Sequence, residues 1–417
     1  MATIDFKAAY KTIMADHFTP RMELSFIGDA GRQTLVYEKM AWVINNEQCG
    51  LRYGENPGQE AALYKLVNGN LQLGDVTSIQ PGRYLASDPE LLQFGKHPGK
   101  TNITDVDNAL NILRYLTEKP CAVIMKHNNP SGAAMAGTLA EAYQRANMAD
   151  RVAAFGGAIV LNREVDLATA RLIAENYAEV VAAPEFAPGV MDIFAAKKNL
   201  RIMKIRNMAR LQDFAAQRVV DIKSLMDGGL IMQWSFRPET RTKESLLPAQ
   251  VTYKGKEYRV QRAPTEKEYA DLIFGWLVEA GVSSNSVLYV KDLCTIGIGT
   301  GEQDRVGVAE IARDKAYRKL ADRICWERHH TPYNNLTDAA KKQEIDEEVR
   351  AKKGGLPGCC MVSDAFFPFR DGIEVGLREG VSAVIQPGGS DRDFESIDAC
   401  NEFNAAMVFT GQRSFKH

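Results

Sequence analysis

Several features that define large classes of proteins are missing from this sequence. No apolar run approaches the ~20 residues that a membrane-spanning helix needs, and residues 1–7 carry none of the apolar core of a signal peptide. The net charge of the 417 residues is only −2, so no general basic field would draw the chain to nucleic acid or to an anionic membrane. We therefore expect a cytoplasmic protein with no nucleic-acid or membrane partner.

The seven cysteines form no recognisable metal or disulfide pattern. They are scattered, only Cys359 and Cys360 are neighbours, and no C-x-x-C is present. His329 and His330 are adjacent rather than four residues apart, so they do not suit one metal on a helix face. An odd number of unpatterned cysteines fits a reducing compartment better than a disulfide framework, and zinc ligation is not expected.

The glycine-rich stretch 297–305 matches neither of the common nucleotide-binding loops. It lacks the G-x-G-x-x-G of dinucleotide-binding domains and the G-K-[ST] of a P-loop. Because it opens a helical pattern, a turn with exposed backbone amides and Arg305 beside it remains compatible with an anion.

What the sequence does contain is an alternation of apolar strands and amphipathic helices. Strand-like runs at 121–125, 158–161 and 180–183 are separated by helical patterns at 139–148 and 166–176, the first reached through the small residues that follow Gly132. Further elements are expected upstream, namely strands at 61–63 and 71–73 and a helix at 105–116. This βαβαβ order predicts a mostly parallel sheet covered by helices.

The second half repeats this plan. Its expected strands are 287–290, 295–298, 361–364 and 383–385, the first two paired, and its expected helices are 306–320 and 373–379. We interpret the repeat as a duplicated α/β unit, with chance similarity between two α/β segments as the alternative. Residues 327–355 are rich in charged and turn residues and are expected to form an exposed helical insertion.

The most informative motif is the heptapeptide Lys126–Gly132. It follows the apolar run 121–125, which places it at the carboxyl end of a strand, where α/β sheets bind ligands. Lys126 offers a fixed positive charge and His127 offers a titratable base. The alternative is a polar loop without a chemical role.

Other segments carry residue types that bind small polar molecules. The arginine and phenol of Arg52–Tyr53 suit a phosphate, the alternative being an arginine in a solvated turn. Phe155 and Gly156 would give a flat apolar wall beside accessible backbone amides, or only a tight turn over the core. Asn285 can donate to an oxyanion and accept from an amine at once, or it can simply end a helix.

The segment 366–371 combines three phenylalanines with a charge pair. An aromatic wall closed by the carboxylate of Asp371 fits a flat heterocycle that carries N–H donors. The alternative is that the phenylalanines belong to the core and that Asp371 caps a helix.

Taken together, these segments resemble the formyltransferase half of the PurH family of bifunctional purine-biosynthesis enzymes, aminoimidazole-carboxamide ribonucleotide (AICAR) transformylase. The matching stretches are LRYGENP, KHNNPSGAA, AFGG, SSNSV, IGIGTGEQDR, SDAFFPFRDGIE and QPGGS. They follow the family's order from about residue 50 onward, and Arg413–His417 resembles the family's R-x-F-x-H ending. The resemblance implies two tandem cytidine-deaminase-like α/β/α units without the zinc signature H-x-E…P-C-x-x-C of the deaminases.

The resemblance also implies an organisation for the chain. Residues 1–45 would be an N-terminal extension, 46–215 the first unit, and 216–417 the second unit with the insertion 327–355 inside it. The family's inosinate (IMP) cyclohydrolase domain does not precede LRYG, which implies a stand-alone transformylase followed by a separate cyclohydrolase. The family's sites lie at a dimer interface, so a homodimer is implied.

Roles for individual residues follow from the same resemblance. His127 would accept a proton from the 5-amino group of AICAR as it attacks the formyl carbon of 10-formyltetrahydrofolate. Lys126 would stabilise negative charge and help to protonate the departing folate nitrogen, and Asn285 would orient the formyl oxygen or the amine. The ribonucleotide would be held by Arg52, Tyr53, Gly156, Glu179, Arg305, Phe366 and Arg413. The pterin would meet Phe155, Phe367 and Asp371, and a potassium ion, held by some relatives, would find oxygen donors in Ser284, Ser286 and Asp364.

The expected reaction is therefore formylation of AICAR in the synthesis of IMP. Departures from the family pattern at Ser131, Glu179 and Ala280 bear on its rate and on the choice of formyl donor. One alternative is formylation of the same nucleotide with formate and ATP, against which the missing P-loop argues weakly. Another is a non-catalytic sensor of a purine ribonucleotide, against which the pair Lys126 and His127 argues, since binding alone needs no base.

Overall fold

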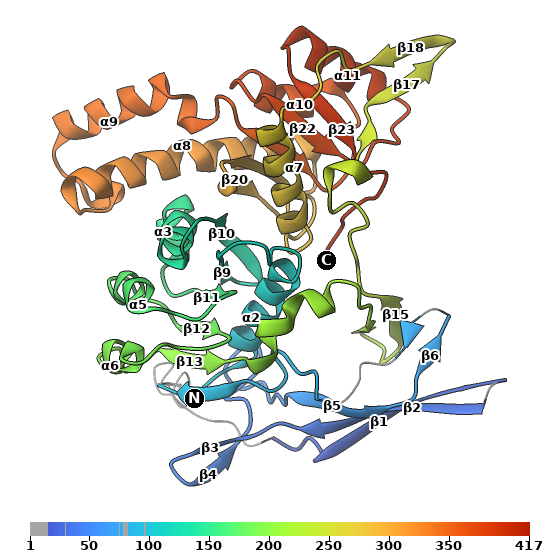
Figure 1. Ribbon diagram of the computed structural model, residues 1–417, viewed down its shortest axis with the longest axis vertical. Coiled ribbons are helices and arrows are strands. Elements are labelled where there is room, and N and C mark those ends of the chain that lie inside the picture. The colour runs from blue at the N-terminus through green and yellow to red at the C-terminus, as the bar shows by residue number, and fades with distance from the viewer. Residues whose placement is uncertain (1–15, 30, 75, 78–81, 96) are drawn as a thin grey trace, which may run out of the picture. The chain divides into compact units, whose positions relative to one another are not determined.

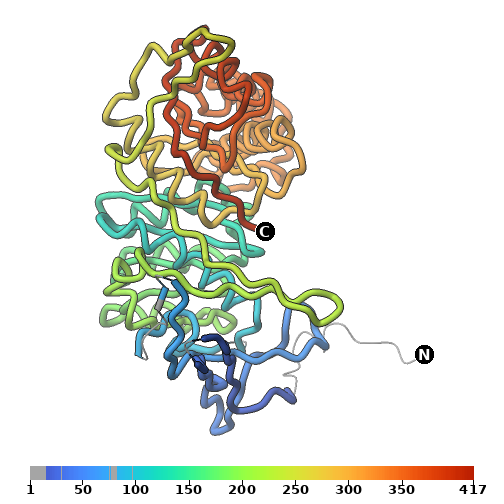
Figure 2. The backbone as a smooth tube through the Cα atoms, turned by 90° about the vertical axis from the view of Figure 1, so that its right-hand side faces the viewer, coloured from blue at the N-terminus to red at the C-terminus, as the bar shows by residue number. Residues whose placement is uncertain are grey.

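The computed structural model describes residues 16–29, 31–74, 76–77, 82–95 and 97–417. The described chain forms two compact units, and the backbone of each can be followed in Figure 2. Unit 1 takes the chain up to Thr117 and the segment Gly156–Arg237, and unit 2 takes Glu118–Phe155 and Pro238–His417. Residues 1–15, which belong to the expected N-terminal extension, lie outside the described residues.

Unit 2 is built on a mixed sheet with the strand order β16-β23-β22-β21-β19-β20-β10-β9. Its strands are β9 Cys121–Lys126, β10 Asn129–Met135, β16 Leu247–Pro248, β19 Val287–Lys291, β20 Cys294–Gly299, β21 Cys360–Ser363, β22 Ala383–Gln386 and β23 Ala406–Phe409. Strands β21, β22 and β23 are parallel, whereas β9–β10, β19–β20 and β19–β21 are antiparallel pairs. The predicted strands of the second half, and the pairing of the first two, are thereby confirmed.

Helices and a separate hairpin complete unit 2. They are α3 Leu139–Ala149, α4 Arg151–Ala154, α7 Glu266–Glu279, α8 Arg305–His329, α9 Ala339–Ala351, α10 Arg370–Leu377 and α11 Asp393–Glu402, with the hairpin strands β17 Gln250–Tyr253 and β18 Lys256–Arg259. Helix α7 begins with a reciprocal cap, in which the Thr265 hydroxyl accepts from the Glu268 N–H and the Glu268 carboxylate accepts from the Thr265 N–H. The buried faces of β19, β21 and β22 pack against α8, α10 and α11 and form one apolar core.

One connection differs from the sequence-based expectation. We expected a helix to follow the first strand through residues 132–137, but strand β10 lies between β9 and α3. Strand β10 was missed because its small residues have low β-propensity. They are required by close packing on α3, since a Cβ added to Gly132 would lie 2.1 Å from the carbonyl oxygen of Ala146. The Lys126–His127 pair is therefore part of a β-hairpin and not of a strand-to-helix loop.

Helix α8 is longer than the predicted 306–320 and reaches His329. Its second half packs beside α9, and the two helices run next to each other (Figure 1). A small apolar cluster that includes Leu320, Ile324, Ile345 and Val349 joins them. The extra turns of α8 are thus stabilised by a partner helix that local sequence patterns do not reveal.

In unit 1 four neighbouring strands have the order β11-β12-β13-β8, in which β8 is antiparallel to β13 and the others are parallel. Its elements are β8 Glu90–Gln93, α2 Lys100–Leu113, β11 Ala158–Leu161, α5 Leu167–Ala174, β12 Val180–Ala183, α6 Val190–Ala195, β13 Arg201–Lys204 and the 3₁₀ segment Arg206–Phe214. The predicted strands 158–161 and 180–183 match to the residue, because both are fully buried apolar runs. Helix α2 begins and ends earlier than the predicted 105–116.

The remaining strands of unit 1 form small antiparallel sheets. Their bounds are β1 Arg21–Gly28, β2 Gly31–Lys39, β3 Trp42–Ile44, β4 Glu47–Cys49, β5 Tyr64–Gly69, β6 Gln72–Leu73, β7 Val76–Thr77, β14 Val220–Ser224 and β15 Leu230–Trp234. The predicted strand at 61–63 is wrong, because β5 begins at Tyr64, where pairing with Lys39 of β2 starts. The β14–β15 hairpin extends from the rest of unit 1 (Figure 2).

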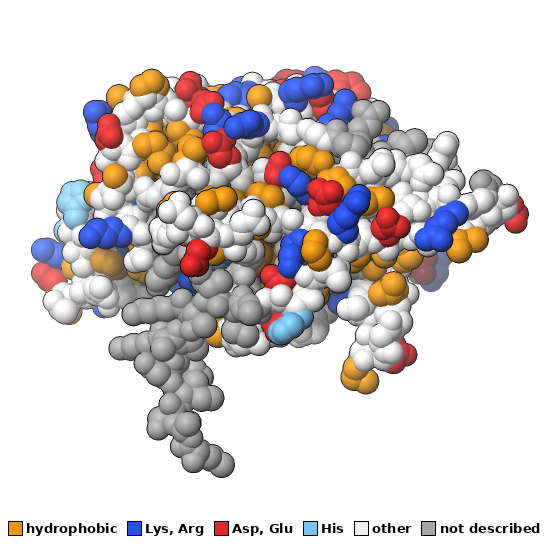
Figure 3. Space-filling view, turned by 90° about the horizontal axis from the view of Figure 1, so that it is seen from below, with side chains coloured by type: hydrophobic (Ala, Val, Ile, Leu, Met, Phe, Trp, Pro, Cys, Tyr) orange, Lys and Arg blue, Asp and Glu red, His pale blue; other side chains and the backbone are white. Residues whose placement is uncertain are grey.

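Both units therefore belong to the mixed α/β class that the sequence predicted. In the described part of the chain, no helix is long and apolar enough to cross a membrane. Within the same residues, no group of three or more His, Cys, Asp or Glu side chains is placed to hold a metal ion. Acidic and basic side chains are interspersed on the face that Figure 3 displays.

Candidate active site

The strand register of unit 2 brings several chain segments to one edge of its sheet. Val287, the first residue of β19, pairs with Gly299 at the end of β20 and with Ser363 at the end of β21. Strand β10 runs antiparallel to β20, so its first residue, Asn129, reaches the same edge. The residues just before β19, just after β20 and β21, and in the β9–β10 turn must therefore lie near one another.

The β9–β10 turn carries the Lys-His pair. Lys126 pairs with Asn129 across a two-residue turn, and the central residues His127 and Asn128 have φ of +53° and +61°. Positive φ at both central positions defines the type I′ turn that suits the twist of a hairpin. The side chain of His127 is exposed at the tip of this turn.

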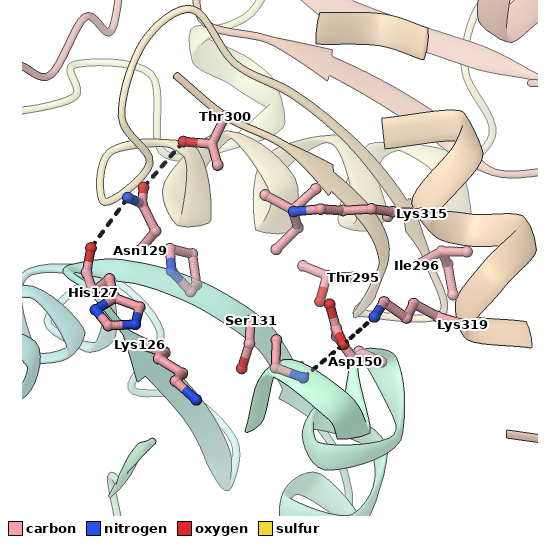
Figure 4. A pocket seen from close by; sticks show the side chains of 15 residues that line it. Lys126, His127, Asn129, Ser131, Asp150, Thr295, Ile296, Thr300, Lys315 and Lys319 are labelled. Carbon is pink, nitrogen blue, oxygen red and sulfur yellow. Dashed lines mark hydrogen bonds and ion pairs between the residues drawn. The ribbon is translucent and has the colours of Figure 1, made fainter. Parts of the chain in front are cut away.

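Asn129 fastens the turn to its surroundings (Figure 4). Its Oδ1 accepts from the backbone N–H of Ser283 at 2.8 Å and from the Thr300 hydroxyl at 3.2 Å. Its Nδ2 donates to the carbonyl of His127 at 3.4 Å. The sequence analysis did not single out this residue, because its partners are more than 150 positions away along the chain.

The ammonium group of Lys126 is also held in place. Nζ donates to the backbone carbonyl of Phe155 at 2.6 Å, which uses one of its three protons. The Phe155 ring itself is 61% exposed. Lys126 thus keeps a fixed position at the edge while two of its N–H groups remain for a ligand.

Asn285 lies on the same edge and is oriented by Arg305. Asn285 Nδ2 donates to the carbonyl of Gln303 at 3.0 Å, and its Oδ1 accepts from Nη2 of Arg305 at 2.9 Å. Nη1 of Arg305 donates to the Ser286 carbonyl and the Ser363 hydroxyl, both at 3.1 Å, and forms an ion pair with Asp364. Arg305 is 8% exposed, and its donors are directed to neighbouring protein groups, with Nη2 orienting Asn285.

Behind Asn285 lies a fully buried carboxyl group. Glu279 at the end of α7 accepts from the Ser286 hydroxyl through Oε1, while its Oε2 has no hydrogen-bond partner in the described chain. Burial raises the pKa of Glu279 well above its usual value, and the neighbouring Asp364 carboxylate acts in the same direction. Both effects favour the neutral form of this carboxyl group.

Two of the three expected potassium ligands, Ser286 and Asp364, lie beside this carboxyl group. The backbone N–H of Ser286 donates to Asp364 Oδ2 at 3.1 Å. The Ser284 hydroxyl accepts from the Lys416 N–H at 3.0 Å, and the Lys416 carbonyl accepts from the Ser284 N–H at 2.9 Å. The C-terminal segment is thus fastened directly to the residue that precedes Asn285.

The remaining predicted residues of unit 2 differ in exposure. Phe366 is 38% exposed, and Asp371, in the first turn of α10, is also exposed. Phe367 is completely buried in the apolar core, so its ring supports the turn and is not presented to a ligand. Arg413 is exposed, with its guanidinium 4.2 Å from the ring centroid of Phe415.

In the described part of unit 2 the sheet edge and the β17 hairpin each border a cavity. One of about 260 Å³ adjoins the Lys126–His127 turn and continues toward α8 (Figure 4). The other, of about 750 Å³, is lined by residues from β17, the end of β23 and the turn after β22, where the sequence reads QPGGS. In that turn the buried Asp393 accepts from the backbone N–H groups of Gly389 and Ser390. Neither cavity could be recognised from the sequence.

Unit 1 places two arginines together in buried positions. Arg52 is 7% exposed, so it does not lie in a solvated turn, and it donates to the Tyr53 hydroxyl at 2.8 Å. Arg201, which the sequence analysis missed, is 2% exposed on β13 and pairs with Glu179 at 3.4 Å. Burial lowers the pKa of Arg201, Glu179 opposes this shift, and the charge of Arg52 adds to it.

The two arginines of unit 1 bring two positive charges into buried positions. Arg201 pairs with Glu179, whose side chain is 39% exposed. Nε of Arg52 is buried and has no hydrogen-bond partner among the described residues. Two neighbouring cations that are removed from water favour the binding of an anion. Gly156, with φ of +73°, donates its N–H to the carbonyl of Tyr177 in the same unit.

Comparisons with known proteins agree with these features. Residues 2–315 match the family model described as "AICARFT/IMPCHase bienzyme". The chain is 39% identical over 369 residues to the bifunctional purine biosynthesis protein PurH of Magnetococcus marinus, covering 88% of this chain and 59% of that protein. It is 35% identical over 412 residues to PurH of Bacillus subtilis, covering 98% of this chain and 65% of that protein. The chain therefore spans less than two thirds of the length of these relatives.

Proposed function

Because the chain belongs to the AICARFT/IMPCHase bienzyme family, we propose that it transfers the formyl group of 10-formyltetrahydrofolate to the 5-amino group of AICAR in the synthesis of IMP. The observation that carries this proposal is the position of the Lys126–His127 turn. Asn129 ties that turn to the segment that presents Asn285, so a base, an ammonium group and an amide share one edge of the sheet.

The chemistry needs these groups because an amine conjugated with the imidazole ring is a weak nucleophile. His127 accepts a proton from the amine as the new C–N bond forms at the formyl carbon, which is worth ~10²–10⁴-fold for a well-placed base. The bond from that carbon to the folate N10 then breaks, and Lys126 supplies a proton to the departing nitrogen. While the tetrahedral intermediate exists, Lys126 and Asn285 offer N–H groups to its oxygen, a stabilisation of about 3–4 kcal/mol for one such donor.

The nucleotide is assigned to the arginines. Arg52 and Tyr53 hold its phosphate. The burial of Arg52 near Arg201, and the Nε of Arg52 that has no hydrogen-bond partner in the described chain, support this assignment. Glu179, whose carboxylate also accepts from Asn102 at 3.1 Å, would receive the ribose hydroxyl groups. The other nucleotide contacts are assigned to Gly156, Phe366, Arg413 and Arg305. Arg305 would contribute by orienting Asn285, to whose Oδ1 it donates.

The folate is assigned to exposed aromatic and acidic groups. Phe155 offers a largely exposed ring, and the exposed carboxylate of Asp371 can accept from the N–H groups of a pterin. Phe367 contributes by holding the turn between β21 and α10 in shape.

A monovalent cation fits the residues around Glu279. Ser284, Ser286 and Asp364 provide hard oxygen donors, and the unpartnered Oε2 of Glu279 is a further buried oxygen beside them. Potassium bound there would stabilise the segment that carries Asn285. The comparison of melting temperature (Tm) in potassium and in sodium chloride tests this, because a specific site responds to one cation only.

The duplication is also proposed. The element order hairpin, helix, strand, helix, strand, helix, strand occurs from β9 to β13 and again from β19 to β23. In each copy a glycine of the second hairpin strand meets the backbone of the following helix: Gly132 faces Ala146, and Gly297 faces Ala312, where an added Cβ would lie 2.3 Å from the carbonyl oxygen. This repeated contact supports two cytidine-deaminase-like sequence repeats, which are distinct from units 1 and 2 as defined above. The repeats are divided near residue 215, and 327–355 is inserted in the second repeat.

The test is to mix purified protein with AICAR and 10-formyltetrahydrofolate and to follow the release of tetrahydrofolate near ~300 nm. His127→Ala should lower kcat by ~10²–10⁴-fold with little change in nucleotide affinity. His329→Ala, at the end of α8, is the matched control. A folded wild-type protein that releases no tetrahydrofolate would refute the proposal.

Further arms of the assay separate the alternatives. In one arm the folate is replaced by formate and ATP. Product forms there only if the protein uses formate and ATP as its formyl donor. If nucleotide binds and neither donor reacts, the chain is a sensor. The implied homodimer with shared sites is tested by mixing two inactive variants, Lys126→Met and Arg413→Met, since shared sites restore part of the activity in mixed dimers.

A further inference from the structure

The cavity beside the Lys126–His127 turn extends well beyond the groups assigned to the reaction. It reaches from the hairpin under β20 to α8, and its volume is about 260 Å³. Its lining includes residues of β10, α3, α4, β20 and α8, and the polar side chains at its inner end are Ser131, Asp150, Thr295, Lys315 and Lys319. The formyl-transfer scheme uses none of these inner groups.

The charges around this cavity do not balance. Lys126, Lys315 and Lys319 all line it, whereas Asp150 is its single acidic residue. Asp150 forms an ion pair of 2.7 Å with Lys319, and the same oxygen, Oδ1, accepts from the N–H of Ala153 at the start of α4. One oxygen of the Asp150 carboxylate is therefore shared by Lys319 and the end of α4.

Lys315 is left without a direct partner. No hydrogen bond or ion pair joins its Nζ to any residue that the structure describes. Figure 4 shows the side chain of Lys315 reaching from α8 into the cavity, with Nζ at the tip of the side chain. Burial lowers the pKa of Lys315, Asp150 opposes this shift, and the charges of Lys319 and Arg318 lower it further. Lys315 is half-buried, and partial removal of an ammonium group from water without a direct ion-pair partner is unfavourable.

We propose that this cavity binds an oxyanion, a carboxylate or phosphate group, with Lys315 as its main ligand and Lys319 beside it. An oxyanion would supply the missing counter-charge and accept the free N–H donors of Lys315. The cavity has room for such a group with a few neighbouring atoms, but it is too small for a whole nucleotide. Ser131, whose hydroxyl donates to the Ile124 carbonyl at 3.2 Å, can also accept or share a hydrogen bond there.

The favoured source of this group rests on the proposed function. The phosphate of AICAR is already assigned to Arg52 and Tyr53, whereas the glutamate carboxylates of the folate donor have no counterpart among the residues named above. The cavity opens beside Lys126 and His127, where the formyl group would be transferred. A glutamate carboxylate, or the additional carboxylates of an oligo-γ-glutamyl tail, would therefore be the occupant, and free inorganic phosphate is the other source of the same chemistry.

The experiment uses Lys315→Met, with Arg318→Met as the matched control, because Arg318 is an exposed cation on the same helix. Direct binding of tri-γ-glutamate and of inorganic phosphate is measured by calorimetry, and the KM for monoglutamyl and triglutamyl donors is measured in the transfer assay. Lys315→Met should weaken tri-γ-glutamate binding and raise the KM of the triglutamyl donor by at least about tenfold, while kcat changes less than about twofold. Arg318→Met should leave all these values within about twofold, and both variants should keep the wild-type Tm or exceed it.

The outcomes separate the parts of the proposal. If phosphate binding depends on Lys315 and the donor KM does not, the oxyanion site stands and the glutamate source is refuted. If neither probe loses affinity in Lys315→Met, the site itself is refuted. If the wild-type protein transfers no formyl group but binds a probe in a Lys315-dependent way, the proposed function falls while the oxyanion site is supported.

Discussion

The side-chain oxygen of Asn129 accepts a hydrogen bond of 2.8 Å from the backbone N–H of Ser283, 154 residues further along the chain. The hairpin that carries Lys126 and His127 is thereby fixed against the segment that carries Asn285. Relative placement of reacting groups is worth several kcal/mol in catalysis, and a shift of ~1 Å can cost ~10²-fold. This bond is thus a positioning contact for the proposed site.

Asn129→Ala should therefore lower kcat by about 10²-fold while the protein remains folded. Asn129→Asp keeps an acceptor for both Ser283 and Thr300 and should recover most of the activity. Kinetics together with circular dichroism check this. Equal activity of Asn129→Ala and wild type would show that the hairpin holds its place without this bond.

Arg52→Met should separate binding from stability. It removes one of two neighbouring buried cations, so Tm should stay constant or rise, because the repulsion between the charges of Arg52 and Arg201 is removed. It also removes a charged hydrogen-bond donor to phosphate, which should weaken nucleotide binding by about 10- to 100-fold. Calorimetric titration with AICAR and thermal melts measure both effects. Arg206→Met, an exposed arginine of the same unit, should change neither.

Glu279→Gln should change how stability depends on pH. The pKa of Glu279 is raised in the folded protein, so its contribution is fully present below the ordinary glutamate value and is lost as pH rises toward the folded-state pKa. A glutamine cannot ionise and avoids this loss. Relative to wild type, the variant should therefore be more stable at pH 8 than at pH 5 in chemical denaturation without potassium. A pH-independent difference would show that Glu279 is not buried as a neutral acid.

Gly132→Ala should destabilise unit 2 by at least about 3 kcal/mol or prevent its folding, because the added methyl group would overlap the Ala146 carbonyl on α3. Gly137→Ala is the matched control, since its nearest neighbour, the Glu141 carboxylate, would lie at an ordinary contact distance of 3.8 Å. Urea denaturation of both variants measures the difference. Similar midpoints for the two would mean that β10 and α3 are further apart than described.

The comparison of sequence and structure shows what local patterns can reveal. Buried β-branched runs such as 158–161 were predicted to the residue, because their composition admits few other structures. Strand β10 was missed because its residues were selected for close packing on a helix and not for strand propensity. The order of elements was therefore predictable, but the hairpin that presents Lys126 and His127 was not.

The candidate site residues also divide into those that local sequence motifs reveal and those that only the structure reveals. Lys126, His127 and Asn285 could be named because they belong to compact motifs, and the structure places them on one edge of unit 2. Arg201 lies inside an apolar run, where the unusual position of a charged residue was the only available signal. Lys315 resembles any lysine on a charged helix, and only the cavity distinguishes it from Arg318, one turn further along.

The pairing of Lys416 with Ser284 has a practical consequence for work on this protein. The backbone N–H of Ser284 donates to the Lys416 carbonyl and its hydroxyl accepts from the Lys416 N–H, so the peptide before Asn285 is held by the C-terminal segment. Removing those few residues, or fusing a purification tag to them, should loosen the amide of Asn285, to which the proposed mechanism assigns the formyl oxygen or the amine. Recombinant forms intended for kinetic study should carry their tags at the other terminus.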